Sequence, residues 1–383
     1  MPALPRNVKA LGLVSFLNDC SSEMIYPLLP AFLARTLGTA AVSLGAIEGA
    51  AEAAAAAMKV AAGRISDRTS RRKPIVLLGY GLASVARPLI AFTGSAAQVL
   101  VLRLVDRAGK GIRSGPRDAL IAEATPPEQR GHAFGFQRAM DHGGAVAGPL
   151  LASAVLLVRE DLRLVFALAA LPAVLVMWTL STKVAETTPE AEAPAAVAAP
   201  RSTSRALPAY LAVLALFALG NSSDAFLLLR AQEAGVALAV IPLLWSFHHV
   251  VKSVFSTPAG KLSDRIGRKA AIVAGWAIYA LSYAGFAVAA GTWHFWGLFA
   301  VYGLFHAFSE GPERALLADL AGTATRGRDF GWFHAVSGGM QLPASLLTGY
   351  LWQAHGARMA LGTGAALAGA AAVALLLFVR PRP

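Results

Sequence analysis

The chain has 383 residues, of which 56% are hydrophobic and 15% are charged, and its formal net charge is +12. Soluble proteins carry charge on about 25% of their residues, so this composition excludes an ordinary soluble domain and indicates an integral membrane protein. The single cysteine, Cys20, excludes an internal disulfide framework and a cysteine-based zinc site.

Apolar segments long enough to cross a membrane follow one another along the chain, since a spanning helix needs about 20 residues. They lack the two-residue alternation of a membrane β-barrel, which favours an all-α integral membrane protein. Polar residues interrupt the first segment and no small-residue cleavage site follows it, so we interpret it as an uncleaved helix. The twelve predicted spans are residues 8–34, 40–62, 75–94, 97–120, 132–157, 164–181, 207–230, 236–259, 270–290, 293–318, 330–353 and 359–379.

Basic residues crowd into the loops on one side of these spans, as at Arg71–Lys73. The loops on the other side hold few of them: Arg35, Arg159, Arg163, Arg358 and, at the end of a span, Arg230. By the positive-inside rule, both termini lie in the cytoplasm of a multi-pass protein of the cell (plasma) membrane. The same placement accounts for most of the net charge without a nucleic-acid partner.

The segment at 182–206, TKVAETTPEAEAPAAVAAPRSTSRA, breaks the apolar pattern. It is rich in Ala, Pro, Thr, Ser and Glu and has too little hydrophobic bulk to pack, which predicts a mobile cytoplasmic linker. The predicted domains are a six-helix bundle at 1–181, the linker at 182–206, and a second six-helix bundle at 207–383.

Short words of the first half recur in the second half in the same order. SGPRDALIAE at 114–123 matches EGPERALLAD at 310–319, and RGHAFGFQRA at 130–139 matches RGRDFGWFHA at 326–335, both at an offset of 196. NDCSSEMI at 18–25 is similar to GNSSDAFL at 220–227, and GRISDR at 63–68 returns as GKLSDR at 260–265. The chain is therefore a tandem duplication, and six helices per half make the halves parallel repeats.

A sequence motif lies between the second and third spans and again between the eighth and ninth. It resembles the signature of the major facilitator superfamily, Gly-x-x-x-Asp-Arg-x-x-Arg-Arg/Lys. The first copy has Ser70 where glycine is usual, and the second copy is complete. The resemblance implies 12 transmembrane helices in two pseudo-symmetric six-helix bundles that work by alternating access. We expect a monomer, because each chain supplies both halves, and no cofactor. We call the following residues the gate motif: Gly63, Asp67, Arg68, Arg72, Gly260, Asp264, Arg265, Gly267 and Arg268.

The resemblance implies that the gate motif latches the cytoplasmic side while the cavity opens outward. A carboxylate at this edge can meet the positive end of a helix, and the arginines can bridge to acidic groups or lipid headgroups. The alternative is that the motif only caps loops and sets topology.

The fifth predicted span carries Gly135, Gly144, Gly148 and Pro149, a pattern similar to the glycine-proline motif of proton-coupled antiporters, most often exporters. The closing glycine pair of that motif is replaced by Ala152 and Ser153. The alternative is that these glycines only permit close packing or a kink.

The fourth span carries charges that a lipid-facing helix would not tolerate. Spacings of four, three and seven residues put its bases on one face, with an acid and another arginine close by. These residues are Arg103, Asp106, Arg107, Lys110, Arg113 and Arg117. Their face must meet water or acidic partners, and the candidate partners are Asp19, Glu23, Glu48 and Glu52.

Glu23 and its repeat counterpart Asp224 are the best candidates for proton coupling. A carboxyl group in a dry cavity can take up and release a proton near neutral pH as access alternates. The alternative for Glu23 is a permanent salt bridge to the fourth span. Glu48 and Glu52 are either substrate or coupling contacts or a structural pair.

No catalytic pattern is present in the sequence: it has no phosphate-binding loop, no nucleophile elbow and no HExxH. Its eight histidines show no convincing metal-ligand spacing. We therefore predict a transporter, not an enzyme, with no metal. The first hypothesis is proton-coupled efflux of a small organic solute, with protons and the lipid bilayer as partners. The alternatives are proton-coupled uptake of a small anion or metabolite, suggested by the basic fourth span, and a non-transporting membrane receptor.

Overall fold

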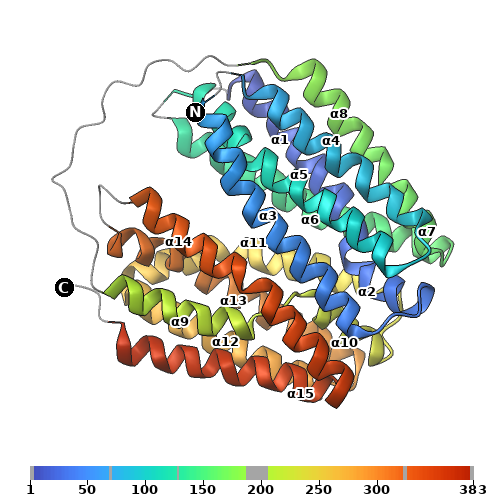
Figure 1. Ribbon diagram of the computed structural model, residues 1–383, viewed down its shortest axis with the longest axis vertical. Helices are drawn as coiled ribbons and strands as arrows, with labels where there is room; N and C mark the ends of the chain where they lie inside the picture. The colour runs from blue at the N-terminus through green and yellow to red at the C-terminus, as the bar shows by residue number, and fades with distance from the viewer. Residues whose placement is uncertain (1–3, 69–70, 127–128, 187–205, 322–325, 380–383) are drawn as a thin grey trace. The chain divides into compact units, whose positions relative to one another are not determined.

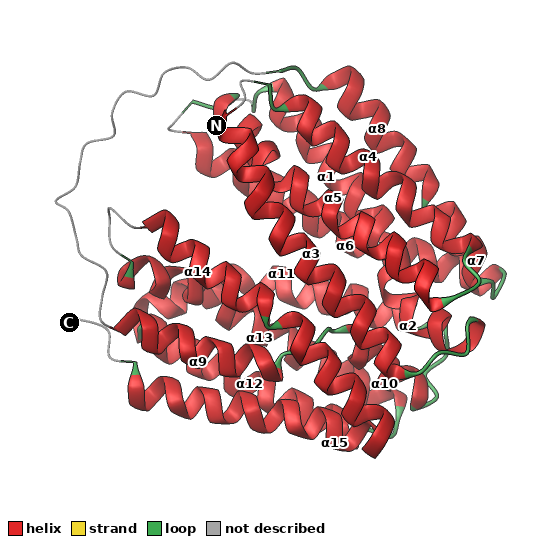
Figure 2. Ribbon diagram, in the orientation of Figure 1, coloured by secondary structure: helices red, strands yellow, loops and turns green. Residues whose placement is uncertain are grey.

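The computed structural model describes residues 4–68, 71–126, 129–186, 206–321 and 326–379. Every regular element within these ranges is a helix, which confirms the all-α prediction (Figure 2). The first half contains α1 Arg6–Ile25, η1 Tyr26–Leu28, α2 Leu29–Ala31, η2 Phe32–Thr36, α3 Ala41–Arg68, α4 Lys73–Leu89, η3 Ile90–Phe92, α5 Ala96–Glu123, α6 Arg130–Val158, α7 Leu162–Leu168 and α8 Ala170–Lys183. The second half contains α9 Ala206–Gly220, α10 Ala225–Glu233, α11 Ile241–Ile266, α12 Arg268–Val288, α13 Thr292–Leu320, α14 Arg326–Gly339 and α15 Gln341–Phe378.

These elements follow the twelve predicted spans in order. Several spans are broken helices: α1 continues into α2, α7 into α8, α9 into α10, and α14 into the first part of α15. Gly356 divides α15, because its φ of 83° and ψ of 169° are open only to glycine. Seven stretches of the described residues are long and apolar enough to cross a membrane by composition. The charged helices α1, α5, α11 and α13 are not among them.

The chain divides by internal contacts into two compact units. Unit 1 comprises Met1–Thr39, Ala50–Ala193 and Ala237–Ser246, and unit 2 comprises Ala40–Gly49, Pro194–Val236 and Phe247–Pro383. The first turns of α3 are thus counted with unit 2, and those of α11 with unit 1. The predicted domain boundaries follow chain order instead, and they stay a prediction.

Unit 1 is built on two tight helix pairs, α1 with α6 and α4 with α5, and α8 packs against α1 and α4 (Figure 1). Its core takes side chains from all of these helices, among them Val14, Tyr80 and Leu120. The α4–α5 crossing is close because a Cβ on Gly109 would lie 2.4 Å from the carbonyl oxygen of Gly79. Only glycine allows this approach, and it brings the charged helix α5 directly against α4.

The core of unit 2 is aromatic. In it α12 packs against α13 and α15, and α15 packs against α9. The rings of Phe217 and Trp276 stack with centroids 4.3 Å apart, and those of Tyr279 and Tyr283 with centroids 4.1 Å apart. Tyr302 of α13 is also fully buried. Aromatic rings bury large areas and prefer such offset contacts, so they hold these helices at fixed rotations.

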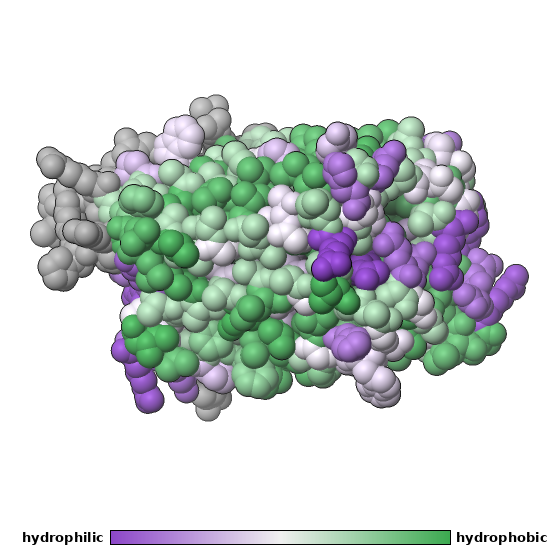
Figure 3. Space-filling view, turned by 90° about the horizontal axis from the view of Figure 1, so that it is seen from below, coloured by the Kyte–Doolittle hydropathy of each residue, from purple (hydrophilic) through white to green (hydrophobic). Residues whose placement is uncertain are grey.

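Large apolar side chains also cover the outside of the helices. Phe92, Val158 and Trp293 are 77%, 90% and 84% exposed. Figure 3 shows a face coloured mostly apolar, with hydrophilic residues confined to patches. Apolar surface of this extent is suited to lipid rather than to water.

Candidate functional site

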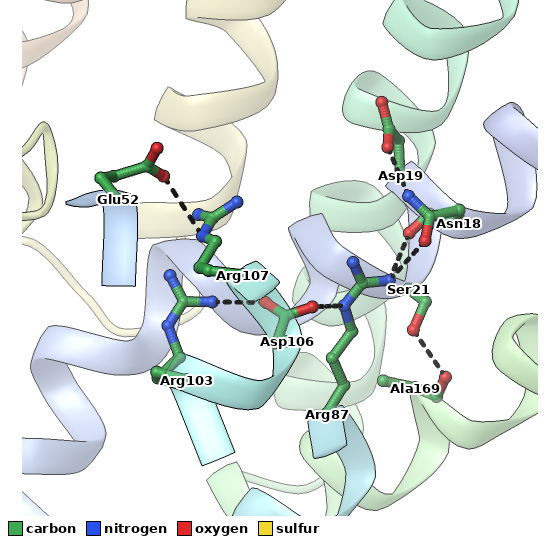
Figure 4. A network of polar contacts seen from close by, with 9 residues as sticks. All are labelled: Asn18, Asp19, Ser21, Glu52, Arg87, Arg103, Asp106, Arg107 and Ala169. Carbon is green, nitrogen blue, oxygen red and sulfur yellow. Dashed lines mark hydrogen bonds and ion pairs between the residues drawn. The ribbon is translucent and has the colours of Figure 1, made fainter. Parts of the chain in front are cut away.

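A buried carboxylate organises the charges of α5 in unit 1. Asp106 pairs through Oδ2 with Arg103 Nη1 at 3.1 Å and through Oδ1 with Arg87 Nε at 2.9 Å (Figure 4). All three side chains are at most 4% exposed. Arg87 lies on α4, and the sequence analysis did not single it out. One acid therefore neutralises arginines from two helices.

The network continues from α4 into α1. Arg87 Nη1 donates to both the backbone oxygen and Oδ1 of Asn18, each at 2.9 Å, and Asn18 Nδ2 donates to Asp19 Oδ1 at 2.8 Å (Figure 4). Asn18 was also missed, because the sequence analysis looked for charged partners of α5. Asp19 is thus linked to the arginines through an amide and forms no ion pair with α5 among the described residues.

Of the predicted acidic partners, Glu52 pairs with the face of α5. Its Oε1 lies 3.2 Å from Arg107 Nε (Figure 4). Glu48 is buried and belongs to the part of α3 that is counted with unit 2, whereas Glu52 belongs to unit 1. Lys110 is exposed on α5 and has no ion-pair or hydrogen-bond partner for its ammonium group among the described residues.

Glu23 is hydrogen-bonded to an indole in the described part of the chain, whereas the alternative interpretation of the sequence expected a salt bridge from Glu23 to α5. Its Oε2 accepts a hydrogen bond of 2.7 Å from Trp245 Nε1. Trp245 lies in the 237–246 segment of unit 1 and also packs on the ring of Tyr26, with centroids 5.3 Å apart. Within the described residues Glu23 forms no ion pair.

Asp224, the repeat counterpart of Glu23, lies at the start of α10 in unit 2. Its Oδ1 accepts a hydrogen bond from the hydroxyl of Tyr302, and the ring of His248 stacks on Tyr302 with centroids 5.2 Å apart. Farther along α13, Glu310 accepts from Lys252 Nζ at 2.6 Å and contacts His306 at 3.2 Å. No group of His, Cys, Asp and Glu side chains suited to a metal occurs among the described residues.

The gate motif is described in part. Gly63, Asp67 and Arg68 lie outside the residues whose side chains are described, while Gly260, Asp264 and Arg265 are described at the end of α11. Gly267 is the N-cap of α12 with a φ of 91°, which is a conformation suited to glycine.

The two arginines that end the gate motif make equivalent ion pairs. Arg72 pairs with Glu123, and Arg268 pairs with Asp319. Both the arginines and the acids are 196 positions apart, which is the offset of the sequence repeat. The duplication therefore extends from sequence words to individual contacts.

The start of the predicted linker is docked in unit 1. Val184 is buried, Ala185 exchanges two hydrogen bonds with the side chain of Asn7, and Glu186 accepts from the backbone N–H groups of Arg72 and Lys73. The Glu186 carboxylate thus caps the first turn of α4, where the helix dipole favours a negative charge. Residues 187–205 of the predicted linker lie outside the described residues.

The glycines of the antiporter-like motif differ in their surroundings. A Cβ on Gly144 or Gly148 would lie 2.3 or 2.4 Å from a backbone oxygen of α1, at Phe16 and Cys20. Gly135 has nothing within 4 Å, and Pro149 lies inside α6. Gly144 and Gly148 therefore serve the α1–α6 contact, and Gly135 does not.

Comparisons with known proteins cover nearly the whole chain. The family model of the Major Facilitator Superfamily matches residues 11–247 and 211–383. An uncharacterised MFS-type transporter of Methanocaldococcus jannaschii is 34% identical over 357 residues, 91% of this chain and 89% of that protein. A tetracycline resistance protein, class E, of Escherichia coli is 35% identical over 150 residues, 38% of this chain and 36% of that protein. The crystal structure of a POT family transporter in complex with 5-aminolevulinic acid superposes with a TM-score of 0.81 at 11% identity, covering 98% of this chain and 96% of that one.

Proposed function

Because the chain belongs to the Major Facilitator Superfamily and is a multi-pass membrane transporter of small molecules, we propose that it exports a small organic solute in exchange for protons. The two halves alternate access to a central site, and Glu23 and Asp224 carry the protons. The observation that carries this proposal is that these two acids have no cationic partner in the part of the chain that the structure describes, whereas Asp106 and Glu52 are paired.

Glu23 can change its charge without breaking an ion pair. Its described partner is the indole N–H of Trp245, which can donate to either a charged or a neutral carboxyl group. A lone carboxylate in a membrane-spanning helix is costly, so protonation of Glu23 is favoured whenever water withdraws from it. Asp106, held between two arginines, stays charged and is a poor proton carrier.

Asp224 in the second half likewise accepts a hydrogen bond from an uncharged donor. The hydroxyl of Tyr302 is its described partner, and the sequence repeat aligns it with Glu23 at an offset of 201. A transporter built from two repeats can use equivalent positions in both halves, so the two acids form a symmetric pair of candidates.

The outward direction is supported by the relative named for tetracycline resistance. A cell can resist a drug by removing it, and the α6 glycine pattern resembles that of exporters. The packing role of Gly144 and Gly148 supports a close α1–α6 contact and is neutral on direction.

The experiment is a coupled flux measurement on purified protein in liposomes that contain a pH-sensitive dye. Organic cations, organic anions and neutral compounds are added one at a time. A substrate-triggered pH change is expected, and its sign separates exchange from co-transport. The variants Glu23→Gln and Asp224→Asn should abolish it, and Glu160→Gln, at an exposed acid in a loop, should not. Substrate flux with no pH change in the parent would contradict the proposal.

A further inference from the structure

The bases of the α4–α5 pair outnumber the acids that neutralise them. Asp106 pairs with Arg87 and Arg103, Glu52 pairs with Arg107, and Asp118 pairs with Arg117. Lys73, the first residue of α4, donates to the backbone oxygen of Ser181. Inside the membrane-spanning part of the pair, Lys110 and Arg113 remain, three residues apart and therefore neighbours on the surface of α5. Neither has an acidic partner among the described residues.

Lys110 is placed deep in the membrane but open to contact. It lies at the middle of a 28-residue helix, so about 20 Å of α5 extends on either side at 1.5 Å per residue. Its side chain is exposed rather than packed. The charged groups around the ammonium group of Lys110 are those of Arg107, Glu52 and Arg113. An ammonium group at this depth cannot face lipid, so its open side must receive water or a ligand.

Arg113 and Tyr80 supply further donors that lack acceptors. Arg113 is 5% exposed, and its Nε and Nη1 have no hydrogen-bond partner among the described residues. Its guanidinium lies over the ring of Tyr80, 4.4 Å from the centroid, and the hydroxyl of Tyr80 is equally without a partner in the described part of the chain. Buried donors are almost always satisfied in folded proteins, so this group requires an acceptor.

We infer that Lys110 and Arg113 bind the carboxylate or phosphate group of an organic anion, and that this anion is the transported substrate. An anion supplies at once the negative charge that Lys110 lacks and an acceptor for Arg113, whose guanidinium is held in place over the ring of Tyr80. Guanidinium and ammonium groups both suit these ligands. The inference rests on the proposed transport function and specifies its substrate class. A lipid headgroup shares this chemistry, but it belongs at the membrane surface, whereas Lys110 is at mid-helix.

The test measures the electrostatic potential at position 110 without knowledge of the natural substrate. Lys110→Cys is made in a Cys20→Ala background and reacted with an anionic and a cationic methanethiosulfonate, the sulfonatoethyl and trimethylammonioethyl reagents. Each rate is divided by the rate with free 2-mercaptoethanol. The matched control is Arg138→Cys, at an exposed arginine of α6.

We expect the normalised preference for the anionic reagent to exceed that of the control by about tenfold, since local fields of this kind concentrate counter-ions by such factors. Adding Arg113→Gln should reduce it. Phenyl phosphate and benzoate should slow labelling at position 110, and benzylamine should not. A preference equal to that of the control, or no protection by either anion, would overturn the inference.

Two further arms complete the test. Labelling in nanodiscs with and without phosphatidylglycerol separates the lipid from the soluble anion: protection by the lipid alone would overturn the substrate assignment.

If Lys110→Cys fails to fold, thermal unfolding of the parent replaces it. Phenyl phosphate should then raise Tm more than benzylamine does, and Lys110→Gln should reduce the difference. None of these readouts needs a proton gradient, so a failure of proton coupling leaves them interpretable.

Discussion

At the scale of single residues, the fate of each charge depends on its partner. Asp106 has two arginines, Glu52 has one, and Glu23 has an indole N–H. A buried charge that loses its partner is strongly destabilising, whereas an exposed pair contributes little. These described contacts are the basis on which we propose that Asp106 and Glu52 hold the fold and that Glu23 exchanges protons.

Replacing Asp106 tests the structural side of this division. Asp106→Asn leaves Arg87 and Arg103 without their carboxylate, so the free energy of unfolding should fall by about 3–5 kcal/mol. Asp118→Asn, which breaks a pair with a 48% exposed acid, should change it by at most about 1 kcal/mol. Thermal unfolding in detergent measures both. Equal losses from the two variants would show that burial does not govern these pairs.

Two glycines of the gate motif should respond in opposite ways to alanine. Gly267 has a φ of 91°, so Gly267→Ala should destabilise the protein by about 1–3 kcal/mol. Gly260 lies inside α11 with nothing within 4 Å of a Cβ, so Gly260→Ala should stabilise it by about 0.5–1 kcal/mol. The same thermal measurement compares them. If Gly260→Ala lowers the stability instead, the added methyl group must meet an atom that the structure does not place near it.

At the scale of elements, hydropathy located the helices but could not set their rotations. The order of the spans and the charges of α5 were predictable because both are periodic patterns. The pairing of Arg87 with Asp106 was not, since it depends on how α4 lies against α5 at Gly79 and Gly109. The Trp245–Glu23 contact joins residues 222 positions apart, and no local pattern marks it.

The α1–α6 contact provides an element-scale prediction. A Cβ at Gly144 would meet the Phe16 carbonyl, so Gly144→Ala should cost about 1–3 kcal/mol and impair folding. Gly135→Ala, where no atom lies within 4 Å, should be neutral or stabilising and should keep transport. Yield, Tm and flux are measured together. Loss of flux in a stable Gly135→Ala protein would favour a direct transport role for that glycine.

At the scale of the whole molecule, the duplication organises both sequence and contacts. The Arg72–Glu123 pair and the Arg268–Asp319 pair follow the same offset of 196 as the repeated words. The repeat was visible in the sequence, and these pairs show that equivalent positions make equivalent contacts. The docking of Glu186 on α4 has no counterpart in the sequence pattern and had to come from the structure.

Equivalent pairs should have equivalent effects. Glu123→Gln and Asp319→Asn each leave an arginine of the gate motif without its acid, so we expect both to reduce substrate flux to a similar degree. Exchanging the two charges within a pair, as in Arg72→Glu with Glu123→Arg, should restore part of the loss. Flux in liposomes measures this. An effect confined to one half would mean that only one copy of the gate motif acts in transport.

The most direct measurement of the central claim compares two modes of transport with a substrate found in the liposome panel. One mode is accumulation driven by a pH gradient, and the other is exchange of labelled for unlabelled substrate at equal pH. Glu23→Gln and Asp224→Asn should lose most of the accumulation, by about tenfold or more, yet keep exchange, because exchange needs no proton movement. Accumulation at the parental level in both variants would contradict the account.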